Sequence, residues 1–303
     1  MFKKDLFSGG ISSIFISVLS ILKSIFLIRI FDLSTSLDAF YLGLSIFQLL
    51  SVNITRYLLL SIQPNIVGEK QMFKANYFIL SIPFSLVLNL IIFLGFDYII
   101  DVFTENLNIK SIIYQNFHLF LILSISNTFF VIFNTYVNTI ISIRLSLLFD
   151  FLISFLLFIS VLMSKGDLNA FLSLNIYSYI LLIIILNIII YIKDSFEFIL
   201  VKNIEWFSLI FKNFKNYLKS FSVNIVSSIF EKNILTSGVS SGDLSIYHTA
   251  SKGVSPFTSL LANQSVLLVS YAKKEISQSK KLLKYHLKNI TVISISIIVI
   301  IQY

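Results

Sequence analysis

The stretch IFISVLSILKSIFLIRIFDLSTSLDAF, residues 14–40, begins as an apolar run long enough to cross a bilayer. Lys23 nevertheless lies inside this run, and Arg29 lies near its end. A charged side chain at the centre of a bilayer costs between about 2.5 and 17 kcal/mol, so such residues mostly face a bundle interior or a water-filled cavity. The stretch therefore predicts a transmembrane helix with a functional polar position.

The composition extends this prediction to the whole chain. The 303 residues are 56% hydrophobic and 13% charged, and the mean hydropathy is +0.89. Soluble domains are about 25% charged, which indicates an integral membrane protein here. The apolar segments are longer than the strands of about ten residues in a membrane barrel, so we expect an all-α, polytopic helical bundle. The absence of cysteine excludes disulfides, thiolate metal sites and cysteine nucleophiles.

Apolar segments of about 20 residues separated by polar breaks predict nine membrane spans. The first lacks a small-residue cleavage site, so it is interpreted as an uncleaved helix and not as a signal peptide. The nine expected spans are residues 10–31, 37–62, 75–100, 113–138, 145–163, 170–192, 218–236, 246–271 and 287–303.

The distribution of lysine and arginine predicts the orientation. If the N-terminus is cytoplasmic, sixteen of the 23 Lys and Arg residues fall in cytoplasmic segments and four fall outside. The remaining three, Lys23, Arg56 and Lys252, lie within spans. This bias follows the positive-inside rule and predicts a multi-pass protein of the cytoplasmic (inner) membrane, with its N-terminus cytoplasmic. Topology and contact with anionic membrane lipids account for the net charge of +8, without nucleic acid as a partner.

The segment 193–217 has the pattern of a basic amphipathic helix, which is typical of a cytoplasmic interface. Its apolar residues at helical spacing are Ile204, Phe207, Ile210, Phe211, Phe214 and Leu218, and they lie opposite Glu205, Lys212, Lys215 and Lys219. The predicted organisation is therefore a six-helix N-terminal lobe (1–192), a connecting helix (193–217) and a partial C-terminal lobe of about three helices (218–303).

Motifs of soluble enzymes are missing from the sequence. It contains no phosphate-binding glycine loop, no Gly-x-Ser-x-Gly and no histidines at metal-binding spacing among His118, His248 and His286. We therefore expect no catalytic residues, no metal and no cofactor. A membrane-embedded saccharide polymerase or ligase would be expected to carry a larger outer loop with clustered acids, so this alternative is less favoured.

The cations inside the spans predict a route for an anion. Lys23 lies about 12 Å below the outer end of its helix, and Lys252 lies about 9 Å below the outer end of the eighth span. Arg56, one turn after Asn53, lies near the inner end of the second span, where it either reaches the inner interface or faces a cavity. Ammonium groups bind phosphate oxygens by charge-assisted hydrogen bonds. The apolar frame favours an amphiphile with a phosphate head and a lipid tail.

Two stretches resemble the MviN/MurJ lipid II flippase family. IRIFDLSTSLDAFYLGLSIFQLL (28–50) is similar to the first-to-second helix signature, in which Arg-Ile-Phe precedes Asp-Ala-Phe, and SGDLSIYHTASKGVSPFTSLL (241–261) is similar to the eighth-helix region. The MOP exporter superfamily around that family also contains O-antigen and capsule repeat-unit flippases and MATE-like multidrug exporters. The resemblance implies two six-helix lobes around a cavity and alternating access, which would move a polyprenyl-pyrophosphate-linked saccharide from the inner to the outer leaflet.

Carried over by position, the resemblance implies that Lys23 and Lys252 match cavity arginines and that Asp38 matches the aspartate of Asp-Ala-Phe. The complete set of expected substrate-binding residues is Lys23, Arg29, Asp38, Asn53, Arg56 and Lys252. The sequence departs from the family at Ser17, Ile21, Asp32 and Ser51, so that two cavity cations are lost and two are lysines. The substrate is therefore expected to be lipid II of peptidoglycan synthesis or a related polysaccharide precursor, with an O-antigen or capsule repeat unit as the alternative. An ion or the membrane potential would supply the energy.

The length of the chain implies an incomplete second lobe, because the family has two complete lobes of six helices. The five-residue segment ISSIF at 11–15 recurs as VSSIF at 226–230. This match aligns helix one with helix seven, as expected for related lobes. The expectation is a truncated gene product or a fragment of a longer flippase, and a fragment that does not transport is a third alternative.

Overall fold

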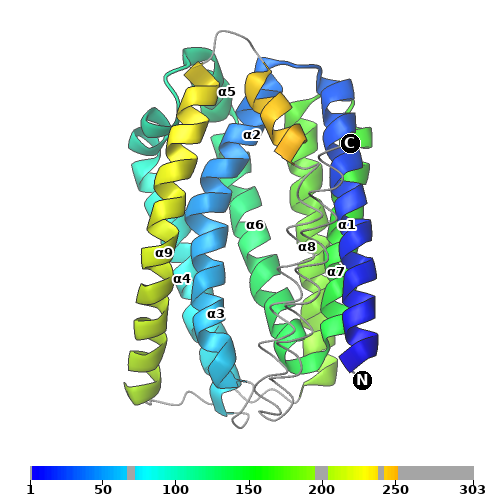
Figure 1. The fold of residues 1–303 in the computed structure, drawn as a ribbon, viewed down its shortest axis with the longest axis vertical. Helices are drawn as coiled ribbons and strands as arrows, with labels where there is room; N and C mark the ends of the chain where they lie inside the picture. The colour runs from blue at the N-terminus through cyan, green and yellow to red at the C-terminus, as the bar shows by residue number, and fades with distance from the viewer. Residues whose placement is uncertain (1, 67–71, 195–203, 238–241, 252–303) are drawn as a thin grey trace, which may run out of the picture.

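The computed structural model describes residues 2–66, 72–194, 204–237 and 242–251, and this part of the chain contains helices and no strand. The helices run along the long axis of an all-α bundle (Figure 1). In chain order they are α1 (Phe2–Phe31), α2 (Thr35–Phe47), the π-helical η1 (Gln48–Asn53), α3 (Ile54–Ile66), α4 (Met72–Phe103), α5 (Leu107–Gln115), α6 (Phe117–Tyr136), the π-helical η2 (Val137–Ile141), α7 (Ile143–Ser164), α8 (Leu168–Lys193) and α9 (Ile204–Ser237). Residues 243–251 begin a further helix.

Five of the described helical stretches are long and apolar enough to cross a membrane. They are Thr35–Gln63, Ala75–Phe103, Phe117–Ile141, Ile143–Ser164 and Leu168–Lys193, and they coincide with the second to sixth expected spans. The first expected span lies within α1, whose side chains are described from Phe15 onward. The eighth span is described only to Ser251, and the ninth lies outside the described residues. Together with the composition, these stretches make the chain a multi-pass membrane protein.

Helix α9 differs from the sequence expectation, because it joins the amphipathic segment from Ile204 and the seventh span in one helix of 34 residues, about 51 Å long. Its buried face packs against protein and not against lipid headgroups. Phe214 meets Phe84 of α4 with ring centroids 5.4 Å apart, and Phe221 meets Tyr57 of α3 at 5.1 Å. The apolar face of α9 packs against α3 and α4 along both the amphipathic segment and the residues that follow it. Residues 204–217 therefore belong to the same helix as residues 218–237 and do not form a separate connecting helix. The division into lobes stays a prediction.

Side chains at the helix ends satisfy backbone groups that the helices leave without partners. Ser34 caps α2 and Ser142 caps α7. Asp167 accepts a hydrogen bond from the Asn169 N–H at 2.9 Å and caps α8. These caps fix the turns between consecutive spans. The α1–α2, α4–α5 and α7–α8 turns lie at one end of the bundle, which we call the Asp38 end, and the N-terminus lies at the other (Figure 1).

A buried polar network joins three spans between the two ends. Asn89 of α4 donates to Ser51 Oγ in η1 at 2.8 Å and accepts from Ser124 Oγ of α6 at 2.8 Å. Thr128 of α6 lies 3.2 Å from Ser51 Oγ. The second amide hydrogen of Asn89 bonds the Ser85 carbonyl, so the polar atoms of the Asn89 side chain are satisfied. The network fixes the register of α4, α6 and the π-helical turn.

We expect Asn89→Ala to destabilise the bundle by about 1–2 kcal/mol, because it breaks two hydrogen bonds between helices inside the membrane. Reversible unfolding of the full chain in mixed micelles measures this change. Asn187→Ala is the matched control, since Asn187 is exposed on α8 and, among the described residues, donates only to the Ile183 carbonyl of its own helix. Equal stability of the two variants would show that the network contributes nothing.

Candidate functional site at the Asp38 end of the bundle

Asp38 joins two helices that lie more than 200 residues apart in the chain. Its carboxylate, 3% exposed in the first turn of α2, accepts hydrogen bonds from Gly242 N at 2.6 Å and from Ser245 N at 2.9 Å. The Ser245 hydroxyl donates a third at 2.5 Å. These backbone N–H groups belong to the start of the helix 243–251, so Asp38 caps that helix from a neighbouring span. We call this contact the Asp38 junction.

The backbone at Gly242 allows the junction to form. Gly242 has φ +101°, a conformation that side chains rarely adopt, and a Cβ built there would lie 2.7 Å from Cβ of Leu33. A larger residue would therefore push the helix 243–251 away from the α1–α2 turn. The sequence SGDLS at 241–245 thus meets two requirements, a glycine that permits close approach and a serine that donates to the carboxylate.

A stacked ring pair lies one turn along each helix from the junction. The rings of Tyr41 in α2 and His248 stack with centroids 4.4 Å apart and planes 18° apart. The Tyr41 hydroxyl is buried beside the side chains of Ser24 in α1 and Thr249. Three elements, α1, α2 and the helix 243–251, therefore meet in this layer. The Asp38 junction and the ring pair together close this end of the bundle.

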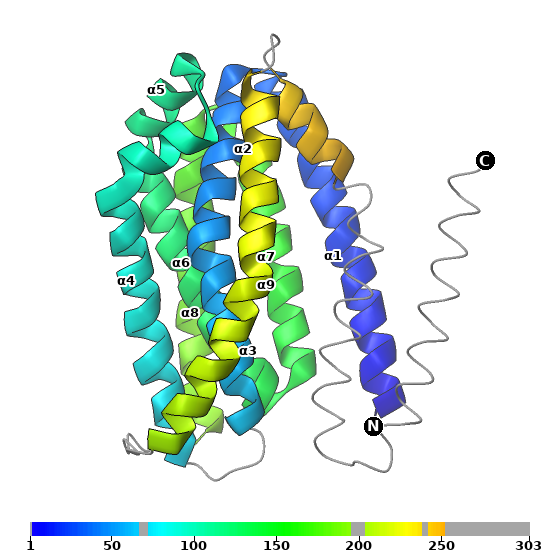
Figure 2. The ribbon, with the colours of Figure 1, turned by 60° about the vertical axis from the view of Figure 1, so that its left-hand side comes forward.

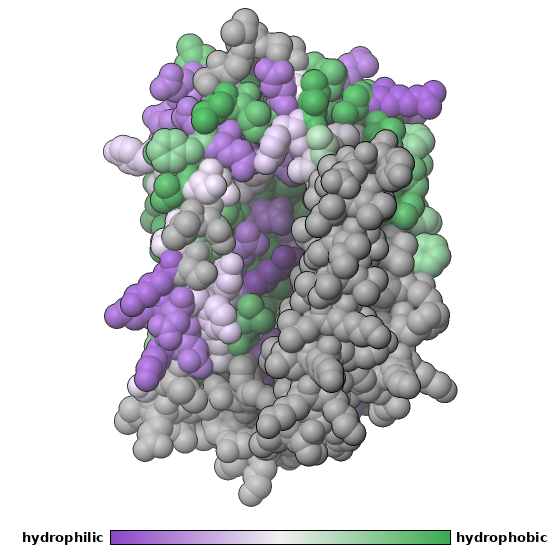
Figure 3. All heavy atoms as spheres, viewed as in Figure 1, coloured by the Kyte–Doolittle hydropathy of each residue, from purple (hydrophilic) through white to green (hydrophobic). Residues whose placement is uncertain are grey.

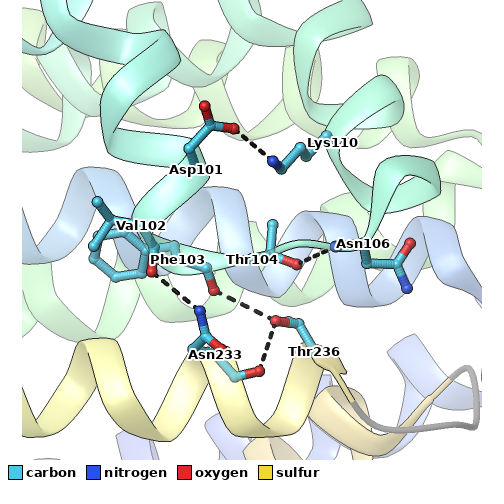
Figure 4. Close-up of polar contacts among 8 residues, drawn as sticks. All are labelled: Asp101, Val102, Phe103, Thr104, Asn106, Lys110, Asn233 and Thr236. Carbon is cyan, nitrogen blue, oxygen red and sulfur yellow. Dashed lines mark hydrogen bonds and ion pairs between the residues drawn. The ribbon is translucent and has the colours of Figure 1, made fainter.

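The last turns of α9 close the same end from another side (Figure 4). Asn233 donates to the carbonyl of Val102 at 3.3 Å, and the Thr236 hydroxyl lies 3.4 Å from the carbonyl of Phe103. Both carbonyls belong to the end of α4, whose connection to α5 also carries the ion pair between Asp101 and Lys110. The contacts of α9 with α4 therefore join polar side chains to backbone carbonyls, and the contact of α4 with α5 is an ion pair.

Lys232 links α9 to the helix 243–251. Its side chain is buried beside Glu231, with Nζ 3.2 Å from Oε1, and Nζ lies 5.1 Å from the centroid of the Tyr247 ring. A cation over an aromatic face is attracted by the negative ring surface. The structure buries the Lys232 side chain in this contact.

The face of the bundle that carries α9 is hollowed, and hydrophilic residues lie in the floor of the hollow (Figure 3). Figures 1 and 2 both show α1 and α9 closer together at the Asp38 end than at the N-terminal end. In the half nearer the N-terminus, Arg56 of α3 is exposed and Asp150 of α7 is partly exposed. Asn134 of α6 donates to the Asp150 carboxylate at 2.8 Å. Hydrophilic side chains therefore lie in a hollow that the Asp38 junction and the last turns of α9 bound at one end.

The expected binding residues do not form one cluster. Asp38 and Arg56 lie on the same span roughly 25 Å apart along its axis. Lys23 is partly buried on α1, and Arg29 is exposed in the last turn of that helix, where its charge is favourable to the helix dipole. Asn53 is partly buried at the end of η1. Lys252 lies outside the described residues.

Two groups of this site were missed from the sequence. Asp150 lies in the fifth expected span, and the rule that selected Lys23, a charge inside an apolar run, selects it equally well. Gly242 and Ser245 lie within the second family-like stretch but carry no sign of their partner, because Asp38 is more than 200 residues away.

The comparisons with known proteins place the fold. A similar solved structure is a MOP superfamily transporter from Pyrococcus furiosus, with a TM-score of 0.71 and 12% sequence identity over 98% of this chain and 71% of that chain. The description of that structure states that the reverse polarity of its binding pocket suggests a different function. No protein-family model and no curated protein matches the chain. The chain therefore shares the fold of that transporter, and the all-α membrane bundle expected from the sequence is confirmed.

We expect Asp38→Asn to open the Asp38 end, because it removes the charge from three hydrogen bonds that are each worth about 1.5–3 kcal/mol. A Thr249→Cys probe in the cysteine-free chain should then react at least about tenfold faster with a membrane-impermeant maleimide. Asp167→Asn is the control, since Asp167 caps only its own helix at the same end. Equal labelling rates in both backgrounds would contradict the role assigned to Asp38.

Proposed function

We propose that this protein is a flippase that moves a polyprenyl-pyrophosphate-linked saccharide from the inner to the outer leaflet by alternating access. The observation that carries the proposal is the Asp38 junction, which closes one end of a hollowed polar face by hydrogen bonds between distant helices. In this proposal the described structure corresponds to the state in which the Asp38 end is closed. With the N-terminus cytoplasmic, as the lysine and arginine distribution predicts, this state faces the inner leaflet.

The chemistry of the Asp38 junction suits a gate. A carboxylate held by two backbone N–H groups and one hydroxyl exchanges these donors for water when the helices separate, so each broken bond costs only part of its gross strength. An apolar contact of similar size would expose its surface to water without such replacement. The polar contacts of α9 with the end of α4 have the same property.

The cations expected within the spans support a phosphate head. Lys23 on α1 and Arg56 on α3 stand on two sides of the bundle, and Lys252 follows directly on the described part of the helix 243–251. Lysine binds phosphate as a point charge and arginine as a bidentate fork. The Pyrococcus furiosus structure is described by the polarity of its pocket. We therefore infer the class of substrate from the charged side chains of this chain and not from its similarity in fold.

The MviN/MurJ-like stretches at 28–50 and 241–261 support a cell-envelope precursor, either lipid II or a related polysaccharide precursor. An O-antigen or capsule repeat unit fits the same charges. The stretches meet in the structure, because Asp38 lies in the first and Gly242 and Ser245 lie in the second. If both family-like stretches take part in closing the cavity, they must contact each other, and the hydrogen bonds of Asp38 provide this contact.

Reconstituted protein separates the candidate functions. A flippase exchanges a labelled polyprenyl-pyrophosphate saccharide between leaflets without covalent change, and a salt gradient or an imposed potential tests the energy source. A saccharide polymerase or ligase instead extends or transfers the glycan in detergent. Leaflet exchange equal to that of protein-free liposomes, with no glycan product, would contradict both and leave a chain that does not transport.

We expect Lys23→Ala to reduce leaflet exchange at least about tenfold, because one lost charge-assisted hydrogen bond to phosphate is worth about 1.5–3 kcal/mol. Lys23→Arg should keep exchange within about threefold of wild type, since it retains the charge and donor. Lys110→Ala is the control, because Lys110 pairs with Asp101 away from the hollow. Unchanged exchange in Lys23→Ala would remove Lys23 from the site.

A further inference from the structure

Helices α9 and α4 run parallel and keep one register along the membrane. Phe214 packs on Phe84 with ring centroids 5.4 Å apart, and Asn233 donates to the Val102 carbonyl at 3.3 Å. The two pairs are separated by 130 and 131 positions in the sequence, so the same offset holds over about 28 Å of helix. Each residue of α9 in this stretch therefore lies level with a known residue of the span Ala75–Phe103.

This register places two lysines of α9 beside the membrane span. Lys215 lies about level with Ser85, and Lys219 lies about level with Asn89, the middle residue of Ala75–Phe103. Both lysine side chains are exposed, and neither forms an ion pair or a side-chain hydrogen bond with the described part of the chain. Charges at this depth need an anion, water or an interface within their reach.

The two lysines lie on the side of α9 that adjoins α4. Phe221 contacts Tyr57 and so marks the side of α9 that faces α3. At 3.6 residues per turn, Lys215 and Lys219 lie about 120° and 160° around the helix from Phe221. Lys215 is also 18 residues, or five full turns, before Asn233, which contacts α4. Figure 2 shows α9 along the outside of the bundle, and Figure 3 shows hydrophilic side chains that project outward on this side.

Helix α4 presents an apolar stripe next to these lysines. Val87, Ile91 and Leu94 follow Phe84 at spacings of three and four residues, so they continue the face of α4 that meets α9. Each of the three is more than half exposed. The stripe extends for about 10 Å toward the Asp38 end, within the roughly 15 Å of hydrocarbon that one leaflet provides.

Charge and apolar surface are therefore arranged in order along the membrane normal. Helical side chains point toward the N-terminus of their own helix, so the lysine ammonium groups lie nearer the N-terminal end of the bundle than the apolar stripe does. A lipid of the leaflet at that end has the same order, with its phosphate outermost and its acyl chains toward the bilayer centre. We call the surface formed by Lys215, Lys219, Val87, Ile91 and Leu94 the α4–α9 seam.

We propose that the α4–α9 seam binds an anionic phospholipid of the leaflet at the N-terminal end of the bundle. Its phosphate accepts hydrogen bonds from Lys215 and Lys219, and one acyl chain lies along the apolar stripe of α4. A zwitterionic lipid carries a cation beside its phosphate, which the lysines repel, so it gains less. The bound lipid neutralises two charges inside the membrane and joins α9 to α4. This site is separate from the transported substrate and does not depend on the proposed function.

Native mass spectrometry of the full chain, released from micelles with equal amounts of phosphatidylglycerol and phosphatidylcholine, tests the charges of the seam. Wild type should retain phosphatidylglycerol at least about tenfold more than phosphatidylcholine. Lys215→Gln combined with Lys219→Gln should abolish this preference, and the corresponding pair of arginine substitutions should keep it, because arginine also binds phosphate. Lys193→Gln is the matched control, since Lys193 is exposed at the same end of the bundle on α8. It should keep the wild-type preference.

A bulky side chain tests the apolar stripe separately. Ile91→Trp should lower the retention of phosphatidylglycerol at least about threefold, because the indole displaces part of the acyl chain. Ile188→Trp is the control, since Ile188 is similarly exposed on α8. It should retain phosphatidylglycerol as wild type does.

Four results would overturn the inference. They are equal retention of the two lipids by wild type, a preference that survives the double glutamine variant, a preference that Lys193→Gln also abolishes, and equal retention of phosphatidylglycerol by Ile91→Trp and Ile188→Trp. Displacement of phosphatidylglycerol by stoichiometric polyprenyl pyrophosphate would assign the seam to the transported substrate, and it would also overturn a phospholipid as the occupant. None of the first four results bears on leaflet exchange, so the proposed function stands or falls by its own assay.

Discussion

One buried carboxylate connects α2 with the helix 243–251. Asp38 accepts two backbone hydrogen bonds and one hydroxyl hydrogen bond from residues 242–245. It thereby caps the helix 243–251 from another span. The close approach at Gly242, the Tyr41–His248 stack and the position of α9 over Tyr247 all depend on this helix beginning where it does. Such hydrogen bonds are strong while the contact is buried, and water can replace the N–H and O–H donors when the helices separate. A gate that opens and closes requires both properties.

Polar groups inside the bundle fall into two kinds with different consequences. The Asn89 network satisfies its amide from three spans and fixes their register, so it stabilises one arrangement. Arg56 of α3 is exposed, and Asp150 of α7 is partly exposed and accepts a hydrogen bond from Asn134. Satisfied polar groups make a wall rigid, whereas charges with available hydrogen-bonding capacity bind ligands. The bundle therefore combines a rigid frame with a polar face that can change partners.

Much of the fold follows from the sequence, because apolar length and helix caps are local properties. The second to sixth spans lie where the hydropathy predicts them, and Ser34, Ser142 and Asp167 cap the helices that follow them. The site follows less well. The capping contact of Asp38 depends on a partner more than 200 residues away, which no local pattern reveals, and its expected role in substrate binding stays a prediction. An amphipathic pattern is the same whether the apolar face of α9 contacts lipid or protein. Periodicity therefore predicted a separate helix over 193–217 and a span over 218–236, whereas residues 204–237 form one helix.

The distance between the two sides of the Asp38 junction tests the central claim most directly. Spin labels at Leu107 on α5, which packs against α2, and at Ile246 on the helix 243–251 follow this distance; both positions are exposed, and the chain has no native cysteine. Without substrate in nanodiscs, the account predicts one narrow distance. Adding a polyprenyl-pyrophosphate saccharide should produce a second, longer distance as the junction opens. A single distance that is unchanged at saturating substrate would contradict alternating access through the Asp38 end.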